Sequence, residues 1–320
     1  MKKRAFAALL ALLMIISLCS CGNAIKSSDD EARIVGECGG KDVRYEELRY
    51  IALTCKEKYL KEYGEDAFLS EEIRDDFLEE VYDQIEENYA SLIAFEKSGI
   101  KLSDKEIKKG VEEYVSYIKD ALGGEEAYIE YLKECNMTDW VCRFTNGLEV
   151  AFEKYYHVVA VDCEKEAYDA VVEKKGFIRT TSIFIKNDEG ESVSENRAIA
   201  ENVLSEIRNG KSLDSFIGSK YNQDLGTCDY YFMKGYFDEE YEEAAFDLEV
   251  GEVSDVVEVD GGFYIIERMP LEDAYFLDNL EMLQNMYIVC RTYENISELA
   301  DGLDFELNAY GKTLDVFNLE

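Results

Sequence analysis

The spacing of apolar residues changes once along this chain, near Gly176, and that change constrains the fold more than any other feature. Between residues 45 and 175, apolar side chains recur every three or four positions, as in an amphipathic helix. From Phe177 to Ile185, β-branched residues prevail, which favours a strand. With 320 residues, the chain is long enough for two domains. The sequence therefore predicts an α+β protein, with a mostly helical N-terminal domain and a smaller domain that contains a sheet.

Capping and turn signals divide the helical region. A short strand and turn over Ile34–Val43 precede a helix that begins near Tyr45. Ser103 and Glu106 have the spacing of a capping box, in which both side chains satisfy free amides at a helix start. Thr138 can cap a later helix that continues to about residue 157. We therefore expect several consecutive helices rather than one long helix.

The second module mixes strands and helices. After the strand at Phe177–Ile185, the sequence predicts helical segments at Ser194–Arg208, Leu213–Lys220 and Glu239–Phe246, and strands at Val253–Val259 and Gly262–Met269. Asp260 and Gly261 separate the last two strands and tolerate the positive φ of a tight hairpin turn. The predicted order is β, α, α, α, β, β, with an antiparallel sheet surrounded by helices.

The chain contains a single proline, Pro270, which directly follows the last predicted strand. Its ring cannot donate a ladder hydrogen bond, so the strand should end there. A long amphipathic helix is predicted over Asp273–Leu299, and the tail Leu303–Glu320 is expected either to add a strand or to pack on the helical part. We therefore expect residues 271–320 to complete the helical domain.

The first residues have the pattern of an export signal. Three basic residues precede an apolar run, Ala5–Leu18, that is too short for a permanent membrane span. The run ends in Leu18-Cys19-Ser20-Cys21, which resembles a lipobox, with Cys21 as the lipidated residue. Cys19 is a weaker acceptor because bulky Leu18 precedes it. An ordinary secretory signal with incidental cysteines is the alternative.

Charge and ligand spacing exclude several classes of function. A formal net charge of −36 repels phosphate backbones and argues against nucleic acid as a partner. The sequence has one histidine, no Cys-x-x-Cys pair and no acidic loop with calcium-site spacing. We therefore expect neither a metal nor a cofactor. The pairing of the cysteines, if any, cannot be deduced from the sequence.

Five sequence blocks over about ninety residues resemble the parvulin (PpiC) family of peptidyl-prolyl isomerases. In chain order they are Phe177–Ile185, Glu206–Phe216, Tyr221–Asp224, Glu242–Ser254 and Gly262–Ile266. The helical region is similar to the N-terminal chaperone region of PrsA- and SurA-type foldases. The resemblance implies a signal peptide over residues 1–20, a tether over 21–32, a helical domain over 33–175, a parvulin-like domain over 176–270 and a C-terminal segment over 271–320.

The resemblance also implies where a site would lie. The two histidine positions of the family fall on Ser182 and Tyr264, and the third polar position falls on Asp224. The apolar residues of the family's proline pocket correspond to Phe237, Tyr241 and Phe246. Without the imidazoles, we expect isomerase activity to be weak or lost. The alternatives are local packing of the Ser and Tyr hydroxyls in the strands, and core packing of the three aromatic rings.

The function that these patterns favour is that of a foldase or chaperone for exported polypeptides. The resemblance implies that it binds unfolded or partly folded chains outside the cytoplasm, anchored through lipidated Cys21 to the outer face of a bacterial cell membrane. Two alternatives stay open: an active prolyl isomerase that uses Ser182, Asp224 and Tyr264, and a solute-binding lipoprotein, which the helix-rich first half opposes. The foldase hypothesis requires the strands at Ile183 and Ile265 to lie side by side.

Overall fold

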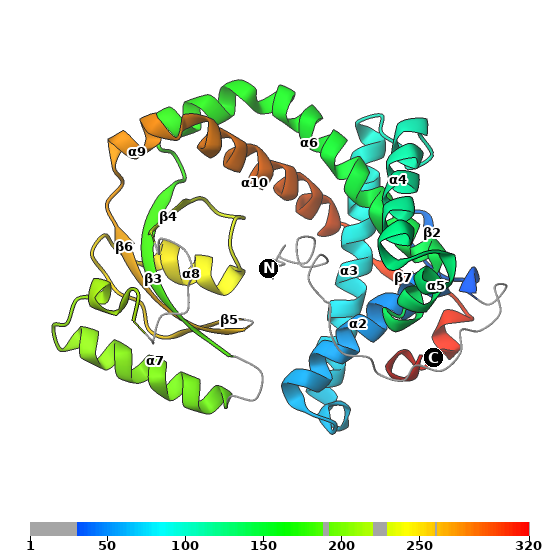
Figure 1. Cartoon of the computed structure of the whole chain (residues 1–320), viewed down its shortest axis with the longest axis horizontal. Helices are drawn as coiled ribbons and strands as arrows, with labels where there is room; N and C mark the ends of the chain where they lie inside the picture. Colours follow the sequence, from blue (N-terminus) through cyan, green and yellow to red (C-terminus); the bar gives the residue numbers. More distant parts are fainter. Residues whose placement is uncertain (1–30, 188–191, 220–228, 260, 320) are drawn as a thin grey trace. The chain divides into compact units, whose positions relative to one another are not determined.

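The computed structural model of the protein describes residues 31–187, 192–219, 229–259 and 261–319. Within these residues the chain forms two compact units. The sheet unit comprises Val159–Glu294, and the helical unit comprises the residues up to Val158 together with those from Asn295 onward. Two helices, α6 (Asp139–Glu173) and α10 (Leu280–Ala300), contribute residues to both units (Figure 1).

The helical unit packs amphipathic helices against a small antiparallel sheet. Its other helices are α2 (Tyr45–Tyr63), α3 (Glu71–Lys97), α4 (Lys105–Leu122) and α5 (Glu125–Glu134), with short 3-10 turns η2 (Ala67–Leu69), η4 (Gly311–Thr313) and η5 (Val316–Asn318). Its strands are β1 (Ile34–Cys38), β2 (Lys41–Arg44) and β7 (Phe305–Leu307), in the order β2-β1-β7. One face of α3, with Phe77, Val81 and Ile85, is fully buried in this core. The C-terminal tail both adds a strand to this unit and packs Phe317 into its core.

The sheet unit is built on four antiparallel strands in the order β4-β3-β6-β5 (Figure 1). The strands are β3 (Ile178–Lys186), β4 (Asp229–Phe232), β5 (Val257–Val259) and β6 (Gly262–Met269), and the other elements are α7 (Val193–Arg208), η3 (Leu213–Phe216), α8 (Glu239–Asp247) and α9 (Asp273–Asp278). Ile183 pairs directly with Ile265, so the two strands on which the foldase hypothesis depends are neighbours. The predicted α+β fold class is confirmed.

Alternation along β3 and β6 gives the sheet two different faces. Ile183 and Ile265 lie in a core with residues of α7. Phe184, Tyr264 and Ile266 lie in a second core with residues of α8. The two helices therefore cover opposite faces of the sheet, and the α8 face carries most of the aromatic rings.

Several helix and strand boundaries agree with the sequence prediction, because residues close to each boundary determine it. A helix begins at Tyr45, as expected, and Thr138 caps α6 by accepting a hydrogen bond from the backbone amide of Val141 at 3.1 Å. The strand and helix predicted around Ile183 and Arg208 agree with β3 and α7 within one residue. These elements have strong periodicity or a clear cap, which explains why the sequence locates them.

Other boundaries differ from the sequence prediction. The capping box at Ser103 is wrong: α4 begins at Lys105 with Asp104 at its N-cap, and the Asp104 carboxylate accepts from the Lys101 amide at 2.9 Å. α6 continues to Glu173, well past residue 157. The helix predicted after Pro270 is interrupted at Asn279, where the backbone leaves helical geometry and divides it into α9 and α10. Strand β4 was not predicted.

Among the described residues, no helix is long and apolar enough to span a bilayer. Within the same parts of the chain, no group of three or more His, Cys, Asp or Glu side chains is arranged to hold a metal ion.

Candidate functional site

The structure brings Ser182 and Tyr264 to the same face of the sheet. Ser182 in β3 pairs with Ile266 of β6, and Tyr264 of β6 pairs with Phe184 of β3. Because paired antiparallel residues point to the same side, both predicted positions face α8. Asp224, the third position, lies outside the described residues, as does Cys21.

Ser182 is enclosed in this face. Its side chain has 0% exposure, and its hydroxyl oxygen has no hydrogen-bond partner among the described residues. A buried hydroxyl without a partner costs about 1–3 kcal/mol of desolvation. Ser182 is therefore placed as an interior side chain, beneath the surface that a ligand would contact.

Tyr264 is held between two aromatic rings. Its ring stacks on Phe184 with 4.5 Å between centroids and meets Tyr241 edge-on at 4.9 Å. Tyr241 is 2% exposed, and its hydroxyl shares a 2.9 Å hydrogen bond with the Thr180 hydroxyl of β3. Aromatic packing thus fills the region where the family resemblance implies a polar centre.

Phe237 lies at the middle of the rings on this face. Its centroid is 4.8 Å from Phe232, 5.0 Å from Tyr241 and 5.4 Å from Tyr230. Phe246 joins the group through Phe232, at 5.8 Å. We call these residues the aromatic cluster; its members are Phe184, Tyr230, Phe232, Phe237, Tyr241, Phe246 and Tyr264.

The aromatic cluster is only partly covered. Phe184, Tyr230, Phe237, Phe246 and Tyr264 are half-buried, while Phe232 and Tyr241 form its floor. Tyr236, next to Phe237, is 49% exposed and contacts the Phe237 ring at 5.3 Å. The three predicted pocket residues therefore belong to one aromatic group, in which Phe237 and Phe246 are partly exposed and Tyr241 is buried.

Two arginines fix the elements around the aromatic cluster. The Arg179 guanidinium of β3 donates hydrogen bonds to both carboxylate oxygens of Asp229, at 2.7 and 2.9 Å. This ion pair raises the pKa of the guanidinium further above its usual range. Arg268 of β6 donates to the Ala245 carbonyl in α8 at 2.8 Å. Burial lowers the pKa of Arg268, while its position near the helix C-terminus favours the cation. These contacts attach β4 to β3 and α8 to β6.

Glu242 is a site residue that sequence reasoning missed. It lies in the family block Glu242–Ser254, and no role was predicted for it. Its buried carboxylate accepts hydrogen bonds from three backbone amides of the loop that carries Phe237. The sequence signal was an acidic residue in the first turns of a helix that follows a glycine-containing loop. Thr180 was also missed, because only the packing of α8 on β3 brings it to Tyr241.

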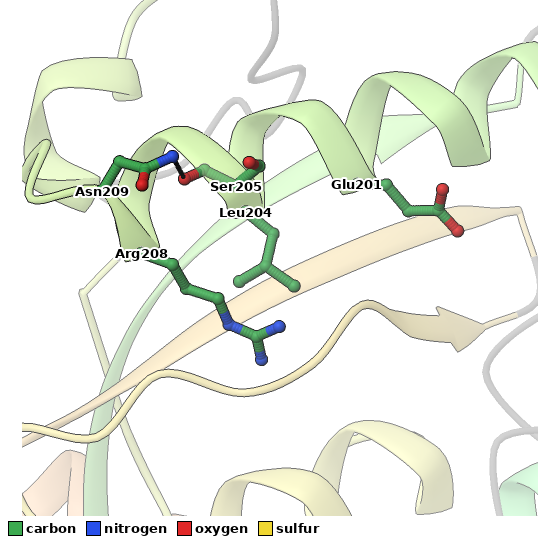
Figure 2. A pocket seen from close by; sticks show the side chains of 5 residues that line it. All are labelled: Glu201, Leu204, Ser205, Arg208 and Asn209. Carbon is green, nitrogen blue, oxygen red and sulfur yellow. Dashed lines mark hydrogen bonds between the residues drawn. The ribbon is translucent and has the colours of Figure 1, made fainter.

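A pocket of about 270 Å³ lies along α7 and is lined by Glu201, Leu204, Ser205, Arg208 and Asn209 (Figure 2). Its polar groups are engaged locally: Asn209 donates to the Ser205 carbonyl at 2.8 Å, and Arg208 pairs with Asp255. Since α7 covers the face of the sheet opposite α8, this pocket is separate from the aromatic cluster. A second pocket, of about 250 Å³, lies in the helical unit at the end of α3.

Residues 166–269 match the PPIC-type PPIASE domain family. The foldase protein PrsA of Staphylococcus aureus (strain bovine RF122 / ET3-1) is 26% identical over 221 residues, which cover 66% of this chain and 67% of the relative. The crystal structure of foldase protein PrsA from Streptococcus pneumoniae str. Canada MDR_19A aligns with 20% identity and a TM-score of 0.37, over 69% of this chain and 83% of that one. Residues 166–269 are therefore similar to a PPIC-type (parvulin-type) domain, and about two thirds of the chain is similar to the foldase PrsA.

Proposed function

We propose that the chain binds unfolded or partly folded exported polypeptides on the aromatic cluster, and that its isomerase activity is weak or lost. The observation that carries this proposal is an aromatic cluster on a parvulin-like sheet in which the two histidine positions of the family carry Ser182 and Tyr264. Ser182 is buried, and its hydroxyl has no hydrogen-bond partner in the part of the chain that the structure describes. Tyr264 is stacked among rings. Half-exposed rings offer large, rigid contact area for apolar segments of many sequences.

The same geometry opposes efficient catalysis. An amide bond resists rotation by about 18–20 kcal/mol, and a catalyst must hold the twisted carbonyl with preorganised donors. Neither family histidine is present at residues 182 and 264, and the Ser182 hydroxyl is enclosed. Binding of an extended chain requires only the apolar surface, so it survives the loss of these donors.

The proposal extends to location and domain layout. We propose that the chain lies outside the cytoplasm and is anchored through Cys21 after removal of residues 1–20. The mature chain would then consist of a tether over 21–32, a helical domain over 33–175, a parvulin-like domain over 176–270 and a C-terminal segment over 271–320. Metabolic labelling with palmitate tests the anchor: the wild-type chain should take up label in the membrane fraction, and Cys21→Ser should not. Equal labelling of both chains would reject the assignment of Cys21.

An aggregation assay tests the binding proposal. We expect the full-length chain at a stoichiometric ratio to suppress the aggregation of a reduced, unfolded protein, and Phe237→Ala to weaken the suppression. Leu277→Ala, which removes a side chain that is 80% exposed in the same unit, is the matched control and should have no effect. Absence of any suppression by the wild-type chain, together with no peptide binding, would overturn the proposal.

An active prolyl isomerase is the second candidate, favoured by the match of residues 166–269 to the PPIC-type domain and by the presence of Asp224 in the sequence. It predicts faster proline-limited refolding at substoichiometric concentrations of the chain. If isomerase activity is weak or lost, the slow phase of refolding should be unchanged.

A further inference from the structure

The carboxylate of Glu242 in α8 holds the loop between β4 and α8 through backbone hydrogen bonds. Glu242 is 9% exposed and stands in the first turns of α8. Its Oε2 accepts from the Gly235 amide at 2.9 Å, and its Oε1 accepts from the amides of Tyr236 and Phe237 at 2.8 and 2.9 Å. Hydrogen bonds to a charged acceptor are stronger than neutral ones, so three on one buried group fix the loop firmly.

The same loop passes close to α10. Gly235 has a φ of +90°, which favours glycine, and a Cβ at this position would come within 3.8 Å of the Cys290 Cβ. Cys290 is 5% exposed. Its burial, and secondarily the Glu242 charge, raise the pKa of its thiol to about 12. Cys290 can therefore report whether the loop stays in place.

The position of this loop decides where the central ring of the aromatic cluster lies. Phe237 contacts the rings of Phe232, Tyr241 and Tyr230, and its own backbone amide is one of the three held by Glu242. A loop released from the carboxylate would no longer hold this ring against the others. We propose that Glu242 is a positioning residue for polypeptide binding, acting through Phe237. This inference rests on the function proposed above, because it assigns a role within the same binding surface.

The chain offers a closely matched control. Glu240 lies on the same helix and carries the same charge, but its side chain is exposed. Glu240→Gln therefore repeats the charge change of Glu242→Gln without altering a buried acceptor. In Glu242→Gln, the amide nitrogen of the new side chain cannot accept from Gly235. Comparison of the two variants separates loop attachment from net charge.

The test is a double-mutant cycle on peptide affinity, with a fluorescein-labelled Gly-Ser-Tyr-Pro-Leu-Ser-Gly peptide as the probe and the full-length chain as the receptor. We expect Glu242→Gln to weaken binding about tenfold, in line with the loss of a charge-assisted hydrogen bond. Glu240→Gln should leave affinity unchanged. In a Phe237→Ala background, Glu242→Gln should cause no further loss, because the ring through which it acts is already absent.

Alkylation of Cys290, followed by mass mapping of its peptide, gives a readout independent of affinity. It should be faster in Glu242→Gln than in wild type and unchanged in Glu240→Gln. The inference would be overturned if Glu242→Gln bound the peptide with wild-type affinity. It would also be overturned if the losses of binding free energy from Glu242→Gln and Phe237→Ala were additive. Either result would leave the proposed function intact. If the wild-type chain does not bind the peptide, both the proposed function and this inference fail.

Discussion

At the scale of single residues, two neighbouring hydroxyls on one strand have opposite surroundings. Ser182 and Thr180 both lie in β3, both are 0% exposed, and both face α8. The Thr180 hydroxyl bonds to Tyr241, whereas the Ser182 hydroxyl has no partner among the residues that the structure describes. The hydroxyl at residue 182 therefore adds no hydrogen bond to the described part of the fold.

Ser182→Ala should leave peptide affinity unchanged and increase the free energy of unfolding by about 1 kcal/mol, because a desolvated hydroxyl is removed. Thr180→Val, a change of similar shape, should lower the free energy of unfolding by about 1 kcal/mol, since it removes the buried hydrogen bond between Thr180 and Tyr241. Urea denaturation and peptide titration measure both effects. A large loss of affinity in Ser182→Ala would show that this hydroxyl contacts the ligand.

A buried carboxyl in the helical unit makes stability depend on pH. Glu47 of α2 is 2% exposed, and burial raises its pKa from 4.5 to about 7, against hydrogen bonds from Tyr89 and Asn88. Glu46 further raises this pKa, and Arg44 lowers it. Because the folded-state pKa lies above the unfolded value, the protonated form favours the fold. This stabilisation is complete below about pH 4.5 and is lost as the pH rises through 7.

Glu47→Gln should therefore reduce the pH dependence of stability. Between pH 5 and pH 8.5, the wild-type free energy of unfolding should fall relative to the variant by up to about 3 kcal/mol. Urea denaturation across this range measures the difference. The exposed substitution Glu113→Gln should follow the wild-type curve. Parallel curves for wild type and Glu47→Gln would contradict the assigned direction of the pKa shift.

At the scale of elements, the C-terminal tail is part of the helical unit's core. β7 pairs with β1, and the Phe305 amide donates to the buried Glu86 carboxylate at 2.9 Å. Phe317 follows in η5 and is 8% exposed. Its ring lies 5.3 Å from that of Phe77 in α3. Residues from the two ends of the chain thus stabilise each other in one core.

Phe317→Ala should lower the free energy of unfolding of the helical unit by about 3–4 kcal/mol, through lost burial and the cavity left behind. Leu69→Ala is the control in the same unit, since Leu69 is 83% exposed and should contribute little. Thermal denaturation followed by far-ultraviolet circular dichroism compares the two variants. An effect of Phe317→Ala below about 1 kcal/mol would mean that the tail does not hold this core together.

The elements that the sequence predicts are those with a local signal. The pattern of β3, the hairpin around Gly261 and the cap at Thr138 are all encoded within a few residues. β4 was missed because its four residues form a strand only by pairing with β3, a partner about fifty positions away in the chain. The break at Asn279 also lacks a proline or glycine that would mark it.

The candidate site divides in the same way. Residues 182 and 264 were identified by the family resemblance alone, and the pairing of β3 with β6 places both on one face of the sheet. The burial of Ser182 depends on how α8 packs on the sheet, which no local pattern reports. The three hydrogen bonds that Glu242 accepts from backbone amides likewise depend on the path of the preceding loop. Tertiary packing therefore decides which family positions remain available to a ligand.

At the scale of the whole molecule, charge and apolar surface favour a binder of polypeptides. Residues 229–259, which carry much of the aromatic cluster, hold eleven Asp and Glu residues and one Lys. Such an acidic segment favours solubility and attracts basic segments at low ionic strength. The chain as a whole, at −36, extends this field. Apolar segments with basic neighbours are accordingly the clients that the proposed surface suits best.

The central claim is that the aromatic cluster binds a polypeptide without accelerating prolyl isomerisation. Two-dimensional exchange NMR on the Gly-Ser-Tyr-Pro-Leu-Ser-Gly peptide tests both parts at once, because uncatalysed exchange takes tens to hundreds of seconds. Addition of the full-length chain should cause saturable shifts of the peptide signals, with no cis–trans exchange peaks at mixing times below about one second. Strong exchange peaks at substoichiometric chain, or the absence of any shift at excess chain, would contradict the central claim.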